Sequence, residues 1–482
     1  MLKVIIMAAG EGTRMKSSTS KVLHKLLNKE ILRYVYDASK LENSETIIIS
    51  GKNKESISEM FDSCRIIEQK IGPEFPYGTG YAVSLCSDYI EDDDEVLVLN
   101  GDIPLITKKA LEDFVNRHIE NNASVSVLST TVTDPTGYGR IIRDKNENFL
   151  QITEHRDLKD EQLDIAEINT GIYIFNGASL KNALKEINTD NDQNELYLTD
   201  CIEVLHKKDE KSMAFMNDEA DLFYGINNKK ELAEAGRILR QRVNEEYMLD
   251  GVIIETPEIV TIEPGVKIGQ DTVISGNVKI LGDTEIGSNC VIEGSSRIEN
   301  SKIYDNVRID NSVIEKSIME EYSNIGPFSH LRPKAHLGKN VHIGNFVEVK
   351  NASMGDGCKA GHLAYIGDCD LGKDINIGCG VIFVNYDGKF KHRSVVGDGA
   401  FIGSNSNIVA PVNIASEGYV AAGSTITKDI DKGELSIERA EQKNIAGYVD
   451  KKKKRDQEKL KERKWHQTVI EAHIFKEGNW SF

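Results

Sequence analysis

A glycine-rich loop near the N-terminus carries the first residues that could do chemistry. Residues 7–14 read MAAGEGTR and follow directly on the apolar run LKVII. A glycine-rich turn after a strand exposes backbone N–H groups that can bind phosphate, and Arg14 and Lys21 follow closely enough to face a triphosphate. The spacing is neither GxxxxGK(S/T) nor GxGxxG, which disfavours a Walker loop and a dinucleotide fold. The loop therefore indicates a nucleotide site of another kind.

A carboxylate at the end of an apolar strand is the second such feature. The run VLVLNGD, residues 96–102, places Asp102 just past the carboxyl end of that strand. Open α/β sheets collect their ligands at this edge, and a carboxylate beside phosphates is a natural Mg²⁺ ligand. The alternative that stays open is an aspartate that caps the next helix.

A set of polar residues in the C-terminal half could perform acyl transfer. An amine that attacks a thioester must lose a proton, and a histidine with a pKa near neutrality suits this task. His362 is the candidate base, and Glu348 is expected to orient or tune it; a packing or surface histidine is the alternative. Arg332 and Lys350 together suit an anionic substrate. The other members of the set are Tyr365, Asn376, Asn385 and Tyr386.

The elements that must position these residues differ between the two halves of the chain. Up to residue 228, apolar strand runs alternate with helical patterns such as Lys108–Asn121, which predicts an α/β sheet with mostly parallel strands. Lys229–Tyr247 has apolar residues near helical spacing and no proline, so it predicts a connecting helix. The expected strands are Leu2–Met7, Thr46–Ser50, Val96–Asn100, Ser124–Thr130 and Gly171–Phe175.

From residue 262 onward, aliphatic residues recur every six positions. The first run is Ile262, Ile268, Ile274, Ile280, Ile286, Ile292 and Ile298; the pattern resumes at Ile325, and again at Met354 and Val396. A period of six fits a coil with three short faces and 18 residues per turn, in which each face points one aliphatic residue inward. Residues 262–431 then make a little over nine coils. Seven consecutive matches disfavour the alternative, a β-sandwich with accidental spacing.

Two segments depart from this repeat. Phe383–Val395, with the sequence FVNYDGKFKHRSV, interrupts it and is expected to be a loop ejected from the coil, as functional loops often are. Asp450–Lys464 holds nine Lys and Arg and four Asp and Glu. It is expected to be a solvated helix, with a polyanion-binding arm as the alternative.

Composition narrows the class of protein. A chain of 482 residues is too long for one core, so we expect domains at 1–228, 251–440 and a linker helix at 229–250, followed by a charged tail at 441–482. The net charge of −18 disfavours a general binder of nucleic acid or anionic membranes, although a local cluster of Lys and Arg can override it. The sequence has no apolar run of 18 residues and no signal-peptide cleavage region, so we expect no membrane span and a cytoplasmic location.

The motifs of the N-terminal half come in the order seen in sugar-1-phosphate nucleotidylyltransferases. They are AAGEGTRM, KVLH, GTG (78–80), LNGDIPL, GYGR (137–140), EINTG (167–171) and GINN (225–228). With the repeat that follows, the chain resembles, up to about residue 447, the bifunctional family that makes UDP-N-acetylglucosamine, a peptidoglycan precursor. It departs from that family at Ser20, where a proline is usual, and at Lys70–Tyr77, which resembles an insertion.

The resemblance implies both the fold and the reactions. The fold would be a Rossmann-like α/β nucleotidyltransferase domain followed by a left-handed parallel β-helix of hexapeptide repeats, assembled as a homotrimer with acetyl sites between subunits. The enzyme would acetylate glucosamine-1-phosphate with acetyl-CoA, and then join the product to UMP from UTP with Mg²⁺. Arg14 and Lys21 would neutralise phosphate charge, and Asp102 and Asn227 would hold Mg²⁺. The residues that would bind nucleotide and sugar are Ala8, Ala9, Gly10, Gln69, Gly78, Thr79, Gly139, Glu154 and Asn169.

The same resemblance implies roles in the acetyl half. His362 would be the general base, Arg332 and Lys350 would bind the sugar phosphate, and Tyr365 and Asn376 would complete the glucosamine pocket. The residues at or beside acetyl-CoA would be Cys379, Asn385, Tyr386, Lys391, Ser404, Ala422 and Arg439, of which Asn385 and Tyr386 also border the glucosamine pocket. The alternatives are a monofunctional nucleotidylyltransferase with a structural repeat, and a non-enzymatic scaffold. The strings AGHLAY and NYDG disfavour the first, and the presence of Lys21, Asp102 and His362 disfavours the second.

Overall fold

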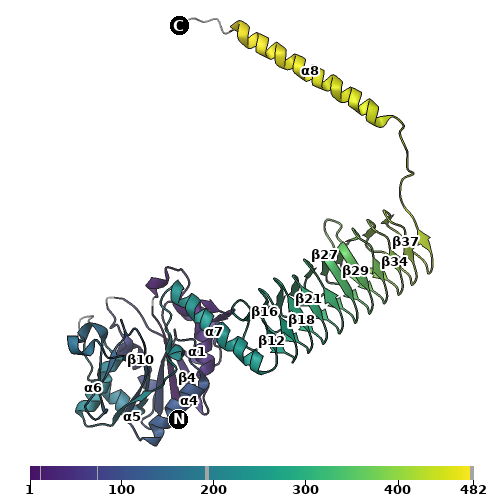
Figure 1. Ribbon diagram of the computed structural model, residues 1–482. Coiled ribbons are helices and arrows are strands. Elements are labelled where there is room, and N and C mark those ends of the chain that lie inside the picture. The colour runs from purple at the N-terminus through teal and green to yellow at the C-terminus, as the bar shows by residue number, and fades with distance from the viewer. Residues whose placement is uncertain (11, 73, 190–194, 478–482) are drawn as a thin grey trace.

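The computed structural model describes residues 1–10, 12–72, 74–189 and 195–477 of the chain, with side chains up to residue 473. Figure 1 shows an N-terminal α/β body, a long coil of short strands beside it, and a helix that stands apart at the C-terminal end. The predicted boundaries at 228, 250 and 440 lie near the changes of architecture, and they stay predictions.

A mixed sheet forms the centre of the N-terminal body, in the strand order β11-β7-β10-β6-β1-β4-β5. The bounds are β1 (Leu2–Ala8), β4 (Ser44–Ser50), β5 (Arg65–Glu68), β6 (Glu95–Asn100), β7 (Val125–Thr131), β10 (Glu167–Asn176) and β11 (Ser212–Met216). All neighbours are parallel except β10, which runs antiparallel to both β6 and β7. The five predicted strands are all present, and the sheet is mostly parallel as expected. The antiparallel strand, β10, contains the predicted Gly171–Phe175. The sequence did not predict its direction, because an apolar run gives no signal of strand direction.

Helices cover both faces of this sheet and create two apolar cores. Their bounds are α1 (Ile31–Ala38), α2 (Lys54–Met60), α3 (Thr79–Ser84), α4 (Lys108–Glu120), α5 (Gly177–Ala183) and α6 (Leu198–Lys207). The predicted helix at 108–121 is α4, which buries Leu111, Phe114 and Val115 at helical spacing. A hairpin of β8 (Arg140–Arg143) and β9 (Phe149–Thr153) extends the sheet beside β10, and β2 (Lys25–Leu26) pairs with β3 (Lys29–Glu30).

The connecting helix is α7 (Lys229–Leu249), and it joins the two bodies into one apolar core. Asn228 caps its start by accepting the backbone N–H groups of Lys230 and Glu231 at 2.9 and 3.0 Å. Near its end the buried Asn244 donates to the carbonyls of Pro257 and Val260 at 2.8 and 3.0 Å. These bonds tie the helix to the first coil that follows it.

The C-terminal half is a parallel β-helix of short strands, from β12 (Ile253–Ile254) to β39 (Leu435–Ser436). Each strand has two or three residues, except β27 (His342–Lys350) and β29 (Lys359–Gly367), which have nine. Ile262 lies in register with Ile280, and Ile280 with Ile298, so residues 18 apart stack on successive coils. The predicted coil with inward aliphatic residues is confirmed.

The coil continues where the six-residue pattern stops. Ile303, Ile309, Ile314 and Met319 are at most 2% exposed and fill the inward positions between Ile298 and Ile325. Three steps of five residues and two of six occur between Ile298 and Ile325, and the offset between neighbouring coils falls to 16, as between Ile298 and Ile314. The break that the sequence suggested before Ile325 is therefore wrong.

The ejected loop is shorter than Phe383–Val395. Phe383 belongs to β32 (Ile382–Val384), is 1% exposed and lies in register with Ile408, so it is an inward residue of the coil. The coil resumes in β33 (Ser394–Val396). The loop itself is residues 385–393, and it lengthens the offset between Ile377 and Ile402 to 25.

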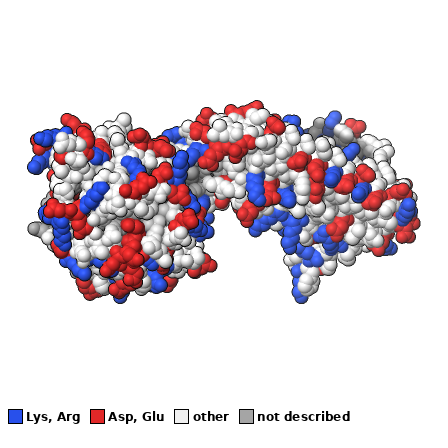
Figure 2. All heavy atoms as spheres, turned by 90° about the horizontal axis from the view of Figure 1, so that it is seen from below, with Lys and Arg blue, Asp and Glu red and all other residues white. Residues whose placement is uncertain are grey.

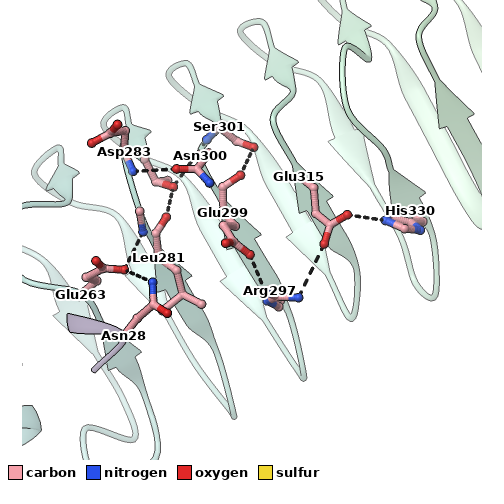
Figure 3. A network of polar contacts seen from close by, with 12 residues as sticks. Asn28, Glu263, Leu281, Asp283, Arg297, Glu299, Asn300, Ser301, Glu315 and His330 are labelled. Carbon is pink, nitrogen blue, oxygen red and sulfur yellow. Dashed lines mark hydrogen bonds and ion pairs between the residues drawn. The ribbon is translucent and has the colours of Figure 1, made fainter. Parts of the chain in front are cut away.

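Polar side chains form ladders on the outside of the coil, because residues about 17 positions apart are neighbours there (Figure 3). Glu263 accepts from Asn28 of the N-terminal body at 2.9 Å and from the backbone of Gly282 at 2.7 Å. Further along, Glu315 lies 3.5 Å from Arg297 and 3.4 Å from His330. The ladders thus extend from the domain junction toward the middle of the coil.

The tail forms α8 (Tyr448–Glu477), a longer helix than the predicted 450–464. Its side chains are exposed at every position from 448 to 473, and Figure 1 shows it apart from the coil. Within the described residues, no helix combines the length and the apolar character needed to cross a bilayer. Figure 2 shows acidic and basic side chains interspersed on the face that it presents.

Candidate active sites

The glycine-rich loop lines a cavity at the carboxyl ends of β1 and β6. Its wall contains eight of the predicted residues, namely Ala8, Ala9, Gly10, Lys21, Gln69, Gly78, Thr79 and Asp102, together with Asn100. Gln69 lies in this wall although an expected insertion follows it, and its side chain is buried. Parallel strands place these loops at one edge, which is where ligands bind in open sheets.

A second cavity adjoins the first and shares Asn100 and Asp102 with it. It contains the other predicted residues of this half, namely Arg14, Gly139, Glu154, Asn169 and Asn227. The structure therefore gathers all the residues that the sequence assigned to nucleotide, sugar and metal around two connected cavities. Asn100 was not predicted, although its place at the end of the apolar strand and two residues before Asp102 was a signal that could have found it.

Opposite charges meet where the two cavities join. The Lys21 ammonium lies 2.5 Å from an oxygen of Asp102 and 3.3 Å from the amide oxygen of Asn227, and Arg14 donates to that same oxygen at 2.9 Å. Asp102 does not cap the next helix, because Thr107 caps α4. The capping alternative is wrong, and the carboxylate of Asp102 faces Lys21 in the site instead.

The oxygens of Asp102 and Asn227 fit Mg²⁺. Both are hard donors, both lie within reach of one cation, the ammonium of Lys21, and Mg²⁺ commonly takes only one or two protein ligands beside substrate phosphates. Groups of three or more His, Cys, Asp or Glu that could hold a metal are absent from the part of the chain that the structure describes. Substrate phosphate oxygens and water would complete the coordination of Mg²⁺ at such a site.

A bulge in β10 shapes the second cavity. The register of β10 with β7 shifts between Asn169 and Ile172. Bulges of this kind are common next to active sites. Gly171 has φ of +77°, and a Cβ there would lie 2.2 Å from the Asn100 side chain. Asn169 donates to Tyr173 at 2.7 Å. Burial, with the charges of Asp157 and Asp200, raises the pKa of Glu154 in the opposite wall.

In the coil, the long strands β27 and β29 lie side by side and carry the acyl-transfer candidates. His362 lies in register with Asn345, and Tyr365 with Glu348. The exposed imidazole of His362 places Nδ1 3.1 Å from the amide oxygen of Asn345. Because an amide oxygen only accepts, Nδ1 carries the hydrogen and Nε2 keeps a lone pair that can take a proton.

Glu348 contacts Arg332. Its carboxylate accepts from the Arg332 guanidinium at 2.8 Å, and the role expected for it in orienting or tuning His362 stays a prediction. Asn345 has the contact with His362, and sequence reasoning missed it. The signal was the 17-residue offset between neighbouring coils, which pairs 345 with 362.

Three cations gather around Lys350. The pKa of Lys350 is held below its ordinary value by a hydrogen bond with Lys391 and by the positive charges of Arg332 and Lys391. Lys391 belongs to the ejected loop, where Tyr386 pairs with it across the hairpin. At the base of the loop, Asn385 donates to Asp368 at 2.5 Å and to Tyr365 at 3.3 Å. The loop thus closes over a site suited to an anion.

Four of the residues expected at acetyl-CoA follow one edge of the coil that starts from His362, namely Cys379, Ser404, Ala422 and Arg439. On the next coil the backbone of Gly380 bonds to Leu363, and further on Asn405 bonds to the carbonyl of Cys379 at 2.7 Å and Gly423 to that of Ser404 at 2.8 Å. Arg439 donates to the carbonyl of Ala422 at 3.0 Å. The side chains of this edge are exposed, including that of Cys379.

Asn376 is the predicted residue that this chain does not bring to the others. It lies in β31 (Asn376–Ile377), in register with Lys359 and Phe401. Tyr365 lies in register with Ile382, on the following face of the coil. The two residues therefore belong to different faces.

Comparison with known proteins agrees with the division of the chain into an α/β half and a β-helix half. Residues 3–233 match the family described as nucleotidyl transferase, and residues 265–300 match the bacterial transferase hexapeptide (six repeats). "Bifunctional protein GlmU" of Clostridioides difficile is 47% identical over 455 residues, which cover 94% of this chain and 98% of that protein. The GlmU proteins of Thermoanaerobacter pseudethanolicus and Acetivibrio thermocellus are each 42% identical, over 94% and 95% of this chain and 99% of those proteins. The chain belongs to the GlmU family.

Membership of the GlmU family confirms the resemblance and the fold class, a nucleotidyltransferase domain followed by a left-handed parallel β-helix of hexapeptide repeats. It also confirms a bifunctional transferase over the monofunctional alternative, since GlmU relatives match the chain through both halves. The roles of individual residues stay predictions.

Proposed function

We propose that this enzyme makes UDP-N-acetylglucosamine in two transfers. It moves the acetyl group of acetyl-CoA to glucosamine-1-phosphate, and then moves UMP from UTP to the N-acetylated product with release of pyrophosphate. The observation that carries the proposal is the presence of two separate sites, each suited to one transfer. One joins Lys21, Arg14 and Asp102 at the sheet edge; the other has His362 beside Asn345 on β29 and β27, with three cations grouped around Lys350 of β27.

In acetyl transfer the amine of the sugar attacks the thioester carbonyl. Arg332, Lys350 and Lys391 bind the sugar phosphate and hold the amine near His362. Nε2 of His362 takes the proton that the amine loses, while Asn345 keeps the hydrogen on Nδ1. A new C–N bond replaces the C–S bond, and the departing thiolate of CoA can recover the proton from the imidazolium. CoA would lie along the edge that Cys379, Ser404 and Ala422 follow.

In uridylyl transfer a phosphate oxygen of the sugar attacks the α-phosphorus of UTP in line. A new P–O bond forms as the bond to pyrophosphate breaks, so the protein mainly aligns the groups and compensates charge. The loop at 8–10 and Thr79 bind the nucleotide, and Lys21 and Arg14 face the phosphates. Asp102 and Asn227 would hold Mg²⁺, which supplies charge neutralisation when bound.

We also assign this chain to a homotrimer with acetyl sites between subunits. An apolar ridge at the corner beside His362 supports a partner chain there: Phe328, Phe346 and Leu363 are each more than half exposed, and the two phenylalanine rings stack at 5.8 Å. A second chain would also supply an Asn376 from its own face to the site of the first. The cytoplasmic location stays a prediction.

The test is one incubation with glucosamine-1-phosphate, acetyl-CoA, UTP and Mg²⁺, from which one component is omitted at a time. Mass analysis should find UDP-N-acetylglucosamine in the complete mixture, and N-acetylglucosamine-1-phosphate accumulating when UTP is left out. Uridylylation of supplied N-acetylglucosamine-1-phosphate without any acetylation would contradict the proposal.

A further inference from the structure

The C-terminal helix α8 has a charge opposite to that of the rest of the molecule. Residues 450–464 hold nine Lys and Arg against four Asp and Glu, a net charge of +5. Since the whole chain has −18, the other 467 residues carry −23. Neither active site described above uses any residue of this helix.

Among the residues that the structure describes, α8 has no side-chain contact with the rest of the chain. Its side-chain contacts stay inside the helix: Lys452 with Asp456 at 3.9 Å, Thr468 with the carbonyl of Lys464 at 2.8 Å, and the ring of Trp465 with that of His466. Residues 437–447, which connect it to the coil, are exposed throughout, and Figure 1 shows the helix projecting from the far end of the coil. Thirty residues make a rod of about 45 Å.

The cations surround the helix instead of forming one stripe. Lys451–Arg455 are five consecutive basic residues, and five positions cover more than one turn. A helix that fits a groove needs an apolar stripe along one face. Positive charge on every side instead suits attraction to an extended anionic surface.

The residues after the basic segment are aromatic and aliphatic. Trp465 is 64% exposed, Val469 40% and Ile470 58%. Both tryptophans of the chain, Trp465 and Trp480, lie in this last segment. Tryptophan and aliphatic side chains next to basic residues are typical of segments that bind at the interface of a bilayer.

The order of these residues favours a lipid surface over single-stranded nucleic acid. Nucleic-acid grooves combine cations with aromatic side chains that stack on successive bases. Between Lys451 and Lys464 the chain has no aromatic residue, since the aromatic residues come after the basic ones. Val469 and Ile470 have no flat face to offer a base, but they can enter a bilayer interface.

We propose that α8 binds this enzyme to the surface of an anionic lipid bilayer. The basic segment 451–464 contacts the head groups, and Trp465, Val469 and Ile470 insert their side chains at the interface. The rest of the molecule has a net negative charge, which disfavours binding of an anionic bilayer by any segment outside α8.

Tryptophan fluorescence of the full chain tests the proposal, because both tryptophans report on the tail alone. The probes are vesicles of phosphatidylcholine with 30 mol% phosphatidylglycerol, and vesicles of phosphatidylcholine only. We expect a blue shift of the emission with the anionic vesicles, reversed by high salt, and co-sedimentation of the enzyme with them. The triple variant K452E/K453E/K454E should bind about a hundredfold more weakly, at about tenfold or less per lysine.

A matched variant separates the helix from net charge. K109E/K145E/K185E changes three exposed lysines of the N-terminal body and alters the net charge by the same amount, and it should bind the anionic vesicles like the parent. Equal loss in both triple variants, an equal shift with neutral vesicles, or no shift at all would overturn the proposal. A shift with single-stranded RNA at concentrations where anionic vesicles give none would replace it by a nucleic-acid role.

Discussion

Removing the amide of Asn345 should slow acetyl transfer and leave uridylyl transfer intact. The His362–Asn345 bond is 3.1 Å long and exposed, so its net worth is about 1 kcal/mol. That bond selects the tautomer whose Nε2 can accept a proton. In Asn345→Ala the other tautomer becomes accessible, and kcat for acetyl transfer should fall about 5- to 10-fold. KM for glucosamine-1-phosphate should change little, because Arg332 and its neighbours bind the phosphate.

The charged variant Asn345→Asp separates positioning from mere packing. A carboxylate in the same place attracts the imidazolium, and at an exposed site this interaction is worth about 1 kcal/mol. The acidic limb of the kcat profile for acetyl transfer should therefore move up by about one pH unit. The assay measures CoA release by thiol detection from pH 5 to pH 9.

An equivalent pair one coil earlier provides the control. His342 places Nδ1 2.5 Å from the amide oxygen of Asn324, and Asn324→Ala should leave the rates of both transfers at the parental level. The reasoning fails if Asn345→Ala keeps the parental kcat, if it reduces both transfers equally, or if Asn345→Asp leaves the pH profile unmoved.

Three further changes test the phosphate clamp, a buried carboxyl and the coil. Arg332→Ala should raise KM for glucosamine-1-phosphate at least tenfold, as loss of a charge-assisted contact does, without altering KM for UTP in steady-state assays. Burial, with the charges of Glu203 and Asp157, raises the pKa of Asp200 to about 6. A carboxyl with a raised pKa stabilises the fold below its unfolded pKa and loses this as pH rises through 6. Asp200→Asn should therefore be more stable than the parent at pH 8, by about 1 kcal/mol in the free energy of unfolding, because the carboxyl is partly exposed. This difference in stability should vanish at pH 3.5. Ile309→Ala should cost about 2–5 kcal/mol in denaturant unfolding, whereas a value near zero would mean that Ile309 lies outside the coil's core.

The repeat could be predicted because stacking makes strict demands on the sequence. One inward position per face fixes the spacing at six wherever the corners have equal length, and Ile262 to Ile298 obey this rule. The corners themselves can shorten by one residue without disturbing the ladder, which is why Ile303 and Met319 were missed. Phe383 was assigned to the loop because the loop begins directly after its short strand, so the six-residue pattern stops there.

Site residues could be predicted where they follow a strand and not where they depend on a neighbouring coil. Asp102 and the loop at 8–10 sit at strand ends, and that position alone brings them together. Glu348 and Asn345 are both polar residues of one strand, and only the register of β27 with β29 decides which of them contacts His362. The direction of β10 was likewise set by its neighbours, which no local pattern encodes.

The most direct test of the account compares Asp102→Ala with His362→Ala in separate assays of the two transfers. Asp102→Ala should lose uridylyl transfer and keep parental acetyl transfer, and His362→Ala should show the reverse. Mixing the two variants with glucosamine-1-phosphate, acetyl-CoA and UTP should restore UDP-N-acetylglucosamine through the released intermediate. Loss of both activities in either variant, with the fold retained by circular dichroism, would contradict the assignment of two separate sites.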